Sequence, residues 1–206
     1  MEREFREKVP VATSVIIGIN LVVWVFLEII GSTQDSWFMV EHGASYLPLI
    51  TENGEWWRLF TCMFLHFGAD HLIDNMLMLF VLGFRLEHAM GSVRFTVLYL
   101  LSGMCGSLLS FWEELPFRFD GDFAVSAGAS GAVFGVMGAL IAWAVLHKGR
   151  VEGLTIKGLL FMAALSLYYG FTTAGIDQAG HIGGFFGGLV LGGIFGFKNG
   201  KQYTGM

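Results

Sequence analysis

Two polar residues in otherwise apolar segments are of types that can perform nucleophilic catalysis together. Ser130 lies in the stretch SAGASGAVFG, which consists almost entirely of small residues, and His181 lies in GHIGGFFGGLVLGG. A serine hydroxyl becomes a strong nucleophile when a histidine within hydrogen-bonding distance removes its proton. Small residues are equally typical of helices that pack closely in a membrane, so the stretch by itself supports either interpretation.

A second group of residues could stabilise the negative charge that such a reaction creates. His71 and Asn75 are four residues apart, which places them on one face of a helix, and both types donate hydrogen bonds to an oxyanion. The backbone N–H of Ser130, at a predicted helix start, is a further donor. No Asp or Glu stands out as a partner for His181, so we expect a dyad, with Phe134 stacked on the imidazole.

The composition indicates that these residues belong to an integral membrane protein. Of the 206 residues, 54% are hydrophobic and 14% are charged, against roughly 25% charged residues in soluble domains. The 29 glycines suit helices whose backbones touch within lipid. The net charge of −5 is scattered along the chain, and without a basic patch we expect no nucleic-acid partner.

Six apolar segments are long enough to be membrane-spanning helices, because a bilayer core requires about 20 apolar residues. The first follows MEREFREKVP and is too long for a signal peptide, so we expect it to remain as a helix. The sequence therefore predicts an all-α, polytopic membrane protein with one domain over residues 1–206. The predicted helices are 10–30, 68–86, 92–112, 128–147, 155–173 and 179–198.

The distribution of Lys and Arg predicts how these helices are oriented. With the N-terminus inside, ten of the twelve basic residues fall in inner segments, as the positive-inside rule requires. Both termini, residues 1–9 and 199–206, are then cytoplasmic. The connection 31–67 is outside and rich in Trp, Phe and Leu, and we expect this long loop to lie at the membrane interface.

This orientation places the chemistry-bearing residues at one depth. The second, fourth and sixth helices all run inward, so His71, Ser130 and His181 lie in first turns near the outer face. Small residues at four-residue spacing let helices approach closely. We expect the fourth and sixth helices to pack through such stripes and to bring Ser130 and His181 within hydrogen-bonding range. On the sixth helix the stripe with four-residue spacing is Gly184, Gly188 and Gly192, and the small residues of the fourth helix are Gly128, Gly131 and Gly135.

Taken together, these motifs resemble those of the rhomboid family of intramembrane serine proteases. The resemblance covers nearly the whole chain and rests on four motifs in order. GxSG alone would be a weak signal, whereas the set is specific. The motifs are Trp57-Arg58, His66-x4-His71-x3-Asn75, Gly128-Ala129-Ser130-Gly131 and His181-x2-Gly184-x3-Gly188.

The resemblance implies a six-helix bundle with Ser130 and His181 as a catalytic dyad in a cavity that opens outward. His71 and Asn75 match oxyanion-binding positions. His66 and Trp57-Arg58 match structural positions; we expect His66 to bond loop carbonyls, and the Trp-Arg pair to anchor or stabilise the first loop. The family cleaves other membrane proteins in or near their spanning segments, without a metal or cofactor. The chain is similar to the minimal bacterial form of the inner (plasma) membrane, and its oligomeric state stays open.

Two other functions remain possible from the sequence. One is a proteolytically inactive rhomboid-like protein that binds membrane clients, although relatives of that kind lack the serine or the histidine. The other is a metal or proton transporter, which would leave the serine without a role. Its ion-binding residues would be His66, Asp70, His71, Asp74 and His181.

The fifth predicted helix carries bulky aromatic residues that fit two interpretations. They could form the lateral wall through which a substrate enters, or they could face lipid. The residues are Phe161, Tyr168, Tyr169 and Phe171.

Overall fold

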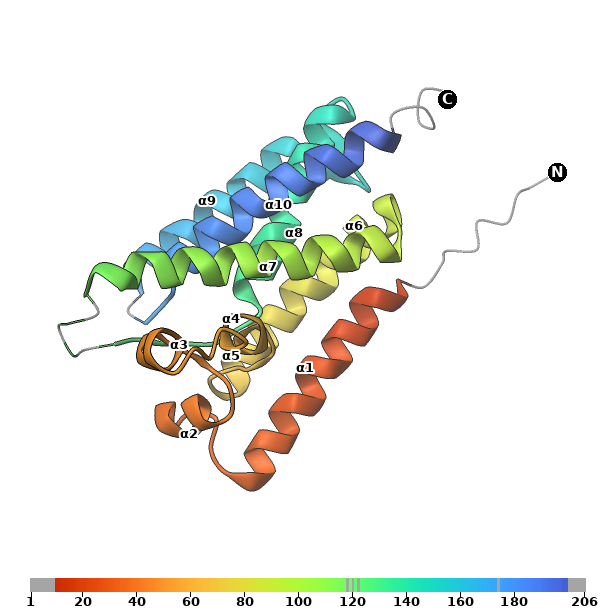
Figure 1. Cartoon of the computed structure of the whole chain (residues 1–206). Coiled ribbons are helices and arrows are strands. Elements are labelled where there is room, and N and C mark those ends of the chain that lie inside the picture. The colour runs from red at the N-terminus through yellow and green to blue at the C-terminus, as the bar shows by residue number, and fades with distance from the viewer. Residues whose placement is uncertain (1–9, 118, 120, 122, 174, 200–206) are drawn as a thin grey trace.

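The computed structural model describes residues 10–117, 119, 121, 123–173 and 175–199, and most of these are helical. Helical segments occur at all six predicted positions (Figure 1). They are α1 (Val11–Ile30), α5 (Gly68–Met78) continued by η2 (Leu79–Gly83) and α6 (Phe84–Met90), α7 (Ser92–Glu114), α8 (Ser130–Leu146), α9 (Ile156–Thr172) and α10 (Gln178–Asn199).

The structure is mostly helical, which agrees with the predicted fold class, and its described part also contains two short strand pairs. Two-residue strands form two antiparallel pairs, one between distant loops and one within a single hairpin. Strand β1 (Ser45–Tyr46) pairs with β2 (Val125–Ser126), and β3 (Arg150–Val151) pairs with β4 (Leu154–Thr155). The first pair joins the long first loop to the segment directly before α8.

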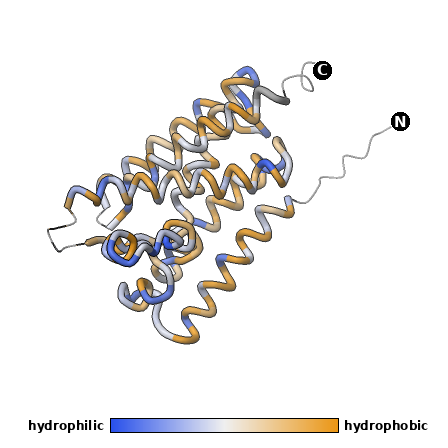
Figure 2. Tube along the Cα trace, viewed as in Figure 1, coloured by the Kyte–Doolittle hydropathy of each residue, from blue (hydrophilic) through white to orange (hydrophobic). Residues whose placement is uncertain are grey.

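The long connection after α1 folds into short helices. These are α2 (Ser36–Glu41), α3 (Leu47–Glu52), α4 (Arg58–Thr61) and the 3-10 turn η1 (Cys62–Phe64), and a further turn, η3 (Leu115–Phe117), follows α7. In Figure 2 hydrophilic residues are frequent in α2, α3 and α4, whereas α1 is hydrophobic for most of its length. The position of this region at a membrane interface stays a prediction.

Not every helix has the length of a membrane span. In the described part of the chain, three helices are long and apolar enough, over residues 11–30, 92–117 and 178–196. A fourth span is present if residues 58–64 and 68–90 are counted as one segment bent by 89°. Helices α8 and α9 are apolar but have only 17 residues each, about 25 Å at 1.5 Å per residue. Six spans therefore stay a prediction.

Segments that were predicted to lie inside do meet at one end of the bundle. Glu87 of α6 accepts hydrogen bonds from the backbone N–H groups of Ala12 and Thr13 at the start of α1, at 2.9 and 2.7 Å. Arg85 donates to the carbonyl oxygen of Glu152 between β3 and β4. Figure 1 shows the start of α1 and the end of α10 on the same side of the molecule. The opposite end carries the starts of α5, α8 and α10.

Helix α8 is the centre of the core. Thirteen of its residues are buried, from Ala132 to Ala144, and it packs against α7 and α10. Its many Gly and Ala residues allow this, because small side chains let helix backbones come into direct contact. A Cβ on Gly188 of α10 would overlap the carbonyl of Gly135, and one on Gly192 would lie 2.6 Å from the Cα of Ala139. Helices α8 and α10 thus form one closely packed pair.

Candidate active site

The packing of α8 on α10 continues to the ends that carry Ser130 and His181. A Cβ on Gly184 would overlap the carbonyl oxygen of Gly131, so the backbones touch one residue after Ser130 and three residues after His181. The predicted stripes pair Gly131 with Gly184 and Gly135 with Gly188. Gly128 does not take part, which corrects that prediction: α8 begins at Ser130, and Gly128 precedes it in an extended turn.

Both residues line one large cavity. It has a volume of about 760 Å³ and is bounded by α5, α8, α9, α10 and the β2 segment. His71 and Asn75 of α5 also line it. The structure thus brings together four residues that sequence reasoning singled out on three separate helices.

His181 is buried and held by an aromatic ring. The imidazole stacks on Phe134 of α8, with ring centroids 4.2 Å apart and planes inclined by 14°, so the expected stacking is present. Its Nδ1 atom is buried and has no hydrogen-bond partner among the described residues. We expected helix packing to bring Ser130 and His181 within hydrogen-bonding range; among the described residues no hydrogen bond joins the two side chains, although both line the same cavity.

Gly128 creates room for hydrogen-bond donors beside Ser130. Its φ of +143° is accessible essentially to glycine alone, and a Cβ at this position would lie 2.9 Å from Nε2 of His71 and 3.8 Å from the backbone N of Ser130. The space beside Gly128 is therefore close both to Nε2 of His71 and to the backbone nitrogen of Ser130. Asn75 is buried, and its side-chain amide donates to the carbonyl of His71 at 2.9 Å, which leaves one amide hydrogen for another acceptor.

His66 fixes the turn that leads into α8. Its Nε2 accepts a hydrogen bond from the backbone N–H of Ala129 at 3.3 Å, and Gly128 donates to the carbonyl of Cys62 at 2.9 Å. We expected His66 to bond loop carbonyls; it binds the amide directly before Ser130 instead. The ring also lies edge-on to His71, with centroids 5.2 Å apart.

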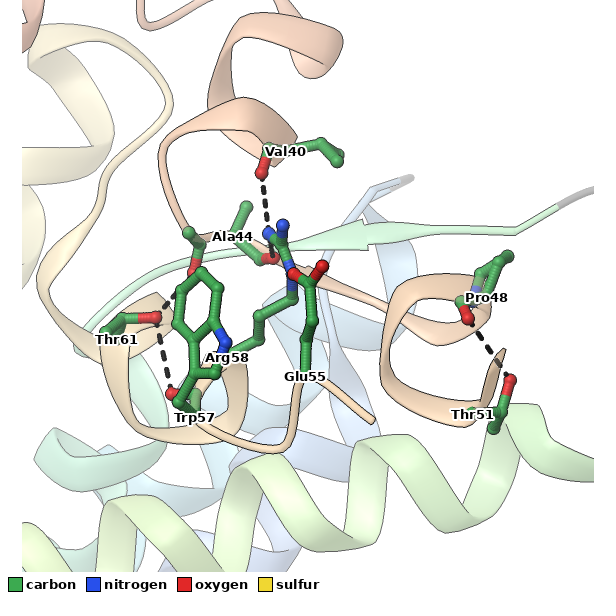
Figure 3. Close-up of polar contacts among 9 residues, drawn as sticks. Val40, Ala44, Pro48, Thr51, Glu55, Trp57, Arg58 and Thr61 are labelled. Carbon is green, nitrogen blue, oxygen red and sulfur yellow. Dashed lines mark hydrogen bonds and ion pairs between the residues drawn. The ribbon is translucent and has the colours of Figure 1, made fainter. Parts of the chain in front are cut away.

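Arg58 stabilises the first loop from within, as Figure 3 shows. Its guanidinium is buried and donates to the carbonyls of Val40 and Ala44, at 2.6 and 3.0 Å. It also pairs with Glu55 at 2.6 Å and lies 4.6 Å from the ring centroid of the half-exposed Trp57. These bonds tie α4 to α2 and to the residue directly before β1. Of the two roles left open for the Trp-Arg pair, they support loop stabilisation for Arg58.

Acidic residues near the site fall into two groups. Asp70 and Asp74 are exposed on α5, and Asp74 lines the rim of the cavity. Asp177, which sequence reasoning missed, directly precedes α10 and lines the same cavity as His181. The sequence did contain a signal for this residue. Asp is a preferred N-cap, and an N-cap side chain accepts from the backbone N–H three residues later, which here belongs to Gly180. In the described chain, no group of three or more His, Cys, Asp or Glu residues is arranged to hold a metal ion.

Comparison with known proteins identifies the family of this arrangement. The family model of the Rhomboid domain matches residues 53–198. This chain belongs to the rhomboid family. The match contains all four motifs and each of the residues around the cavity named above.

Proteins named as rhomboids or rhomboid-like match most of the chain. Rhomboid protease GluP of Bacillus subtilis (strain 168) is 36% identical over 186 residues, which are 90% of this chain and 35% of GluP. RHOMBOID-like protein 7 of Arabidopsis thaliana is 41% identical over 73% of this chain and 46% of its own length. Putative rhomboid protease YdcA of Bacillus subtilis is 30% identical over 88% of this chain and 86% of YdcA. The chain thus spans less than half of the first two relatives.

Proposed function

We propose that this rhomboid is a serine endopeptidase that hydrolyses peptide bonds in or near the membrane-spanning segments of other membrane proteins. One observation carries the proposal. Ser130 and His181 extend from two helices whose backbones touch, and they line one cavity together with His71 and Asn75. Relatives named as proteases support the same reaction.

In the proposed reaction His181 takes the proton of Ser130 while the serine oxygen attacks a substrate peptide carbonyl. The carbonyl oxygen becomes an oxyanion, which accepts hydrogen bonds from the backbone N–H of Ser130 and from the side chains of His71 and Asn75. His181 then returns the proton to the leaving amine as the C–N bond breaks. Water hydrolyses the resulting acyl-enzyme and restores the serine.

The proposal extends to topology and location. Six helices would cross a bacterial plasma membrane with both chain ends in the cytoplasm, and the cavity would open to the outer side. The distribution of basic residues supports this orientation. The substrates would be membrane proteins with a small residue before the scissile bond and a helix that unwinds easily there.

Labelling with a fluorophosphonate tests the nucleophile without a known substrate. We expect the purified wild-type protein to be labelled at Ser130 and the Ser130→Ala variant to remain unlabelled. Ser166→Ala is a matched control, because Ser166 presents a hydroxyl to the same cavity from α9 and its loss should leave the labelling intact. Ser130→Ala and His181→Ala should each abolish cleavage of a spanning test substrate.

The alternatives predict different results. A folded wild-type protein that is neither labelled nor active would instead be a client-binding rhomboid-like protein. Activity that persists in both Ser130→Ala and His181→Ala would refute the dyad. Loss of cleavage upon chelation would favour a metal-dependent function.

A further inference from the structure

Asp177 caps the helix that carries His181. Its Oδ1 accepts a hydrogen bond of 2.7 Å from the backbone N–H of Gly180, and its carbonyl accepts one of 3.2 Å from the N–H of His181. A side-chain acceptor directly before a helix that bonds the third helical N–H is a standard N-cap. The first turn of α10, from Gln178 to His181, is therefore held by Asp177.

This capped turn is where α10 contacts two other helices at once. A Cβ on Gly106 of α7 would lie 2.6 Å from the carbonyl oxygen of Gly180, and one on Gly131 would lie 3.2 Å from it. Gly180 precedes His181, and Gly131 follows Ser130. The cap thus holds the backbone of Gly180, directly before His181, against that of Gly131, directly after Ser130.

The carboxylate also has an electrostatic consequence for the reaction. His181 lies in the first turn of α10, where the helix dipole contributes partial positive charge and disfavours an imidazolium. Asp177 places a carboxylate one turn away at the same cavity. The other ionisable side chains that line this cavity come from two further helices: His71 and the exposed Asp74 from α5, and the exposed Tyr169 from α9. Among them, Asp177 alone is on the helix of His181.

We infer that Asp177 is a positioning residue of the proposed protease: its cap holds the first turn of α10 against α8, and its negative charge offsets the positive helix end when His181 takes the proton of Ser130. This inference rests on the proposed function, because it presupposes the Ser130–His181 pair. It assigns to this chain an acidic residue that acts on the dyad through the end of the helix that carries His181.

Two substitutions separate the cap from the charge. Asp177→Asn keeps an oxygen that can accept from Gly180 but removes the charge, and Asn is an equally good cap. We expect its melting temperature and KM to match those of the wild type, and its kcat to fall about 3- to 10-fold. Asp177→Ala removes both, so kcat should fall further and the melting temperature should drop by about 2–4 °C. Asp70→Asn, which removes an exposed carboxylate from α5, is the control and should keep the wild-type kcat.

A third variant keeps the inference testable if Asp177→Asn does not fold. Asp177→Glu keeps the charge with a poorer cap, so its kcat should exceed that of Asp177→Ala at a similar melting temperature. A wild-type kcat in Asp177→Asn, or equal kcat values for the Glu and Ala variants, would overturn the inference. The proposed function would survive both results, because its failure is seen separately as a wild-type protein that fluorophosphonate does not label.

Discussion

Two of the helices that flank the cavity, α8 and α9, have the same length but are held very differently. Thirteen of the 17 residues of α8 are buried, whereas α9 buries only Leu159, Ala163 and Gly170. Helix α8 meets α10 through backbone contacts between glycines. Helix α9 instead exposes bulky side chains, which are Phe161, Leu165, Tyr168, Tyr169 and Phe171.

This difference matches two different demands of an intramembrane protease. The nucleophile and the base must be held to within a fraction of an ångström, because a displacement of about 1 Å can cost about 100-fold in rate. A wall through which a substrate enters must instead move at low cost, and few buried contacts make such movement easy. Close packing on the α8–α10 side and loose packing on the α9 side would meet both demands. Substitutions on the α8–α10 side and on the α9 side should therefore have different effects.

The largest effect is expected where the backbones of α8 and α10 touch. Gly184→Ala places a methyl group on the carbonyl of Gly131, so the helices must separate. We expect a loss of about 1–3 kcal/mol of stability and cleavage reduced about 100-fold, measured by thermal unfolding and a cleavage assay. Gly193→Ala is the matched control on the same helix, since no atom lies within 4 Å of its Cβ position. Equal behaviour of the two variants would contradict close packing as the source of precision.

A smaller and more local effect is expected at Gly128. Gly128→Ala strains the backbone at φ +143° and pushes its methyl group to within 2.9 Å of His71, so an oxyanion donor is displaced. Removing such a donor costs about 10²–10³ in rate, and because His71 is displaced rather than removed we expect cleavage to fall only about 10-fold. Gly153→Ala also places a side chain at a positive φ, +78° in the β3–β4 turn, but with no neighbour within 4 Å. It should lose stability but retain activity; a similar loss of activity there would make strain alone the explanation.

The smallest effect is expected on α9. Leu165 lines the cavity and is 56% exposed, so Leu165→Ala should change the free energy of unfolding by no more than about 0.5 kcal/mol. Cleavage of a spanning substrate should be unchanged or a few times faster, because a smaller side chain widens the entrance. A destabilisation as large as that of Gly184→Ala would show that α9 is as firmly packed as α8, and the comparison would fail.

Much of this arrangement could be predicted from local patterns. Apolar runs located the helices to within a few residues, because hydrophobicity and helix length depend on the chain alone. The glycine stripes predicted that α8 and α10 pack closely, and the structure supplies the register, with Gly131 against Gly184 and Gly135 against Gly188. Gly128 was assigned wrongly, since the same stripe extends past the start of α8, where the backbone leaves the helical conformation. His66 and Asp177 bind backbone amides, and such partners follow from loop geometry, which composition does not reveal.

The sequence by itself determined the family, the helical segments and the four polar residues whose types can perform acyl transfer. These follow from residue identity and spacing, which are local properties of the chain. The tertiary structure decided which of these residues share a cavity, how Gly128 makes room for His71 beside Ser130, and that Asp177 caps the helix of His181. The physical reason is that helices α5, α8 and α10 are distant in sequence, and only their packing sets the relative position of the side chains they carry.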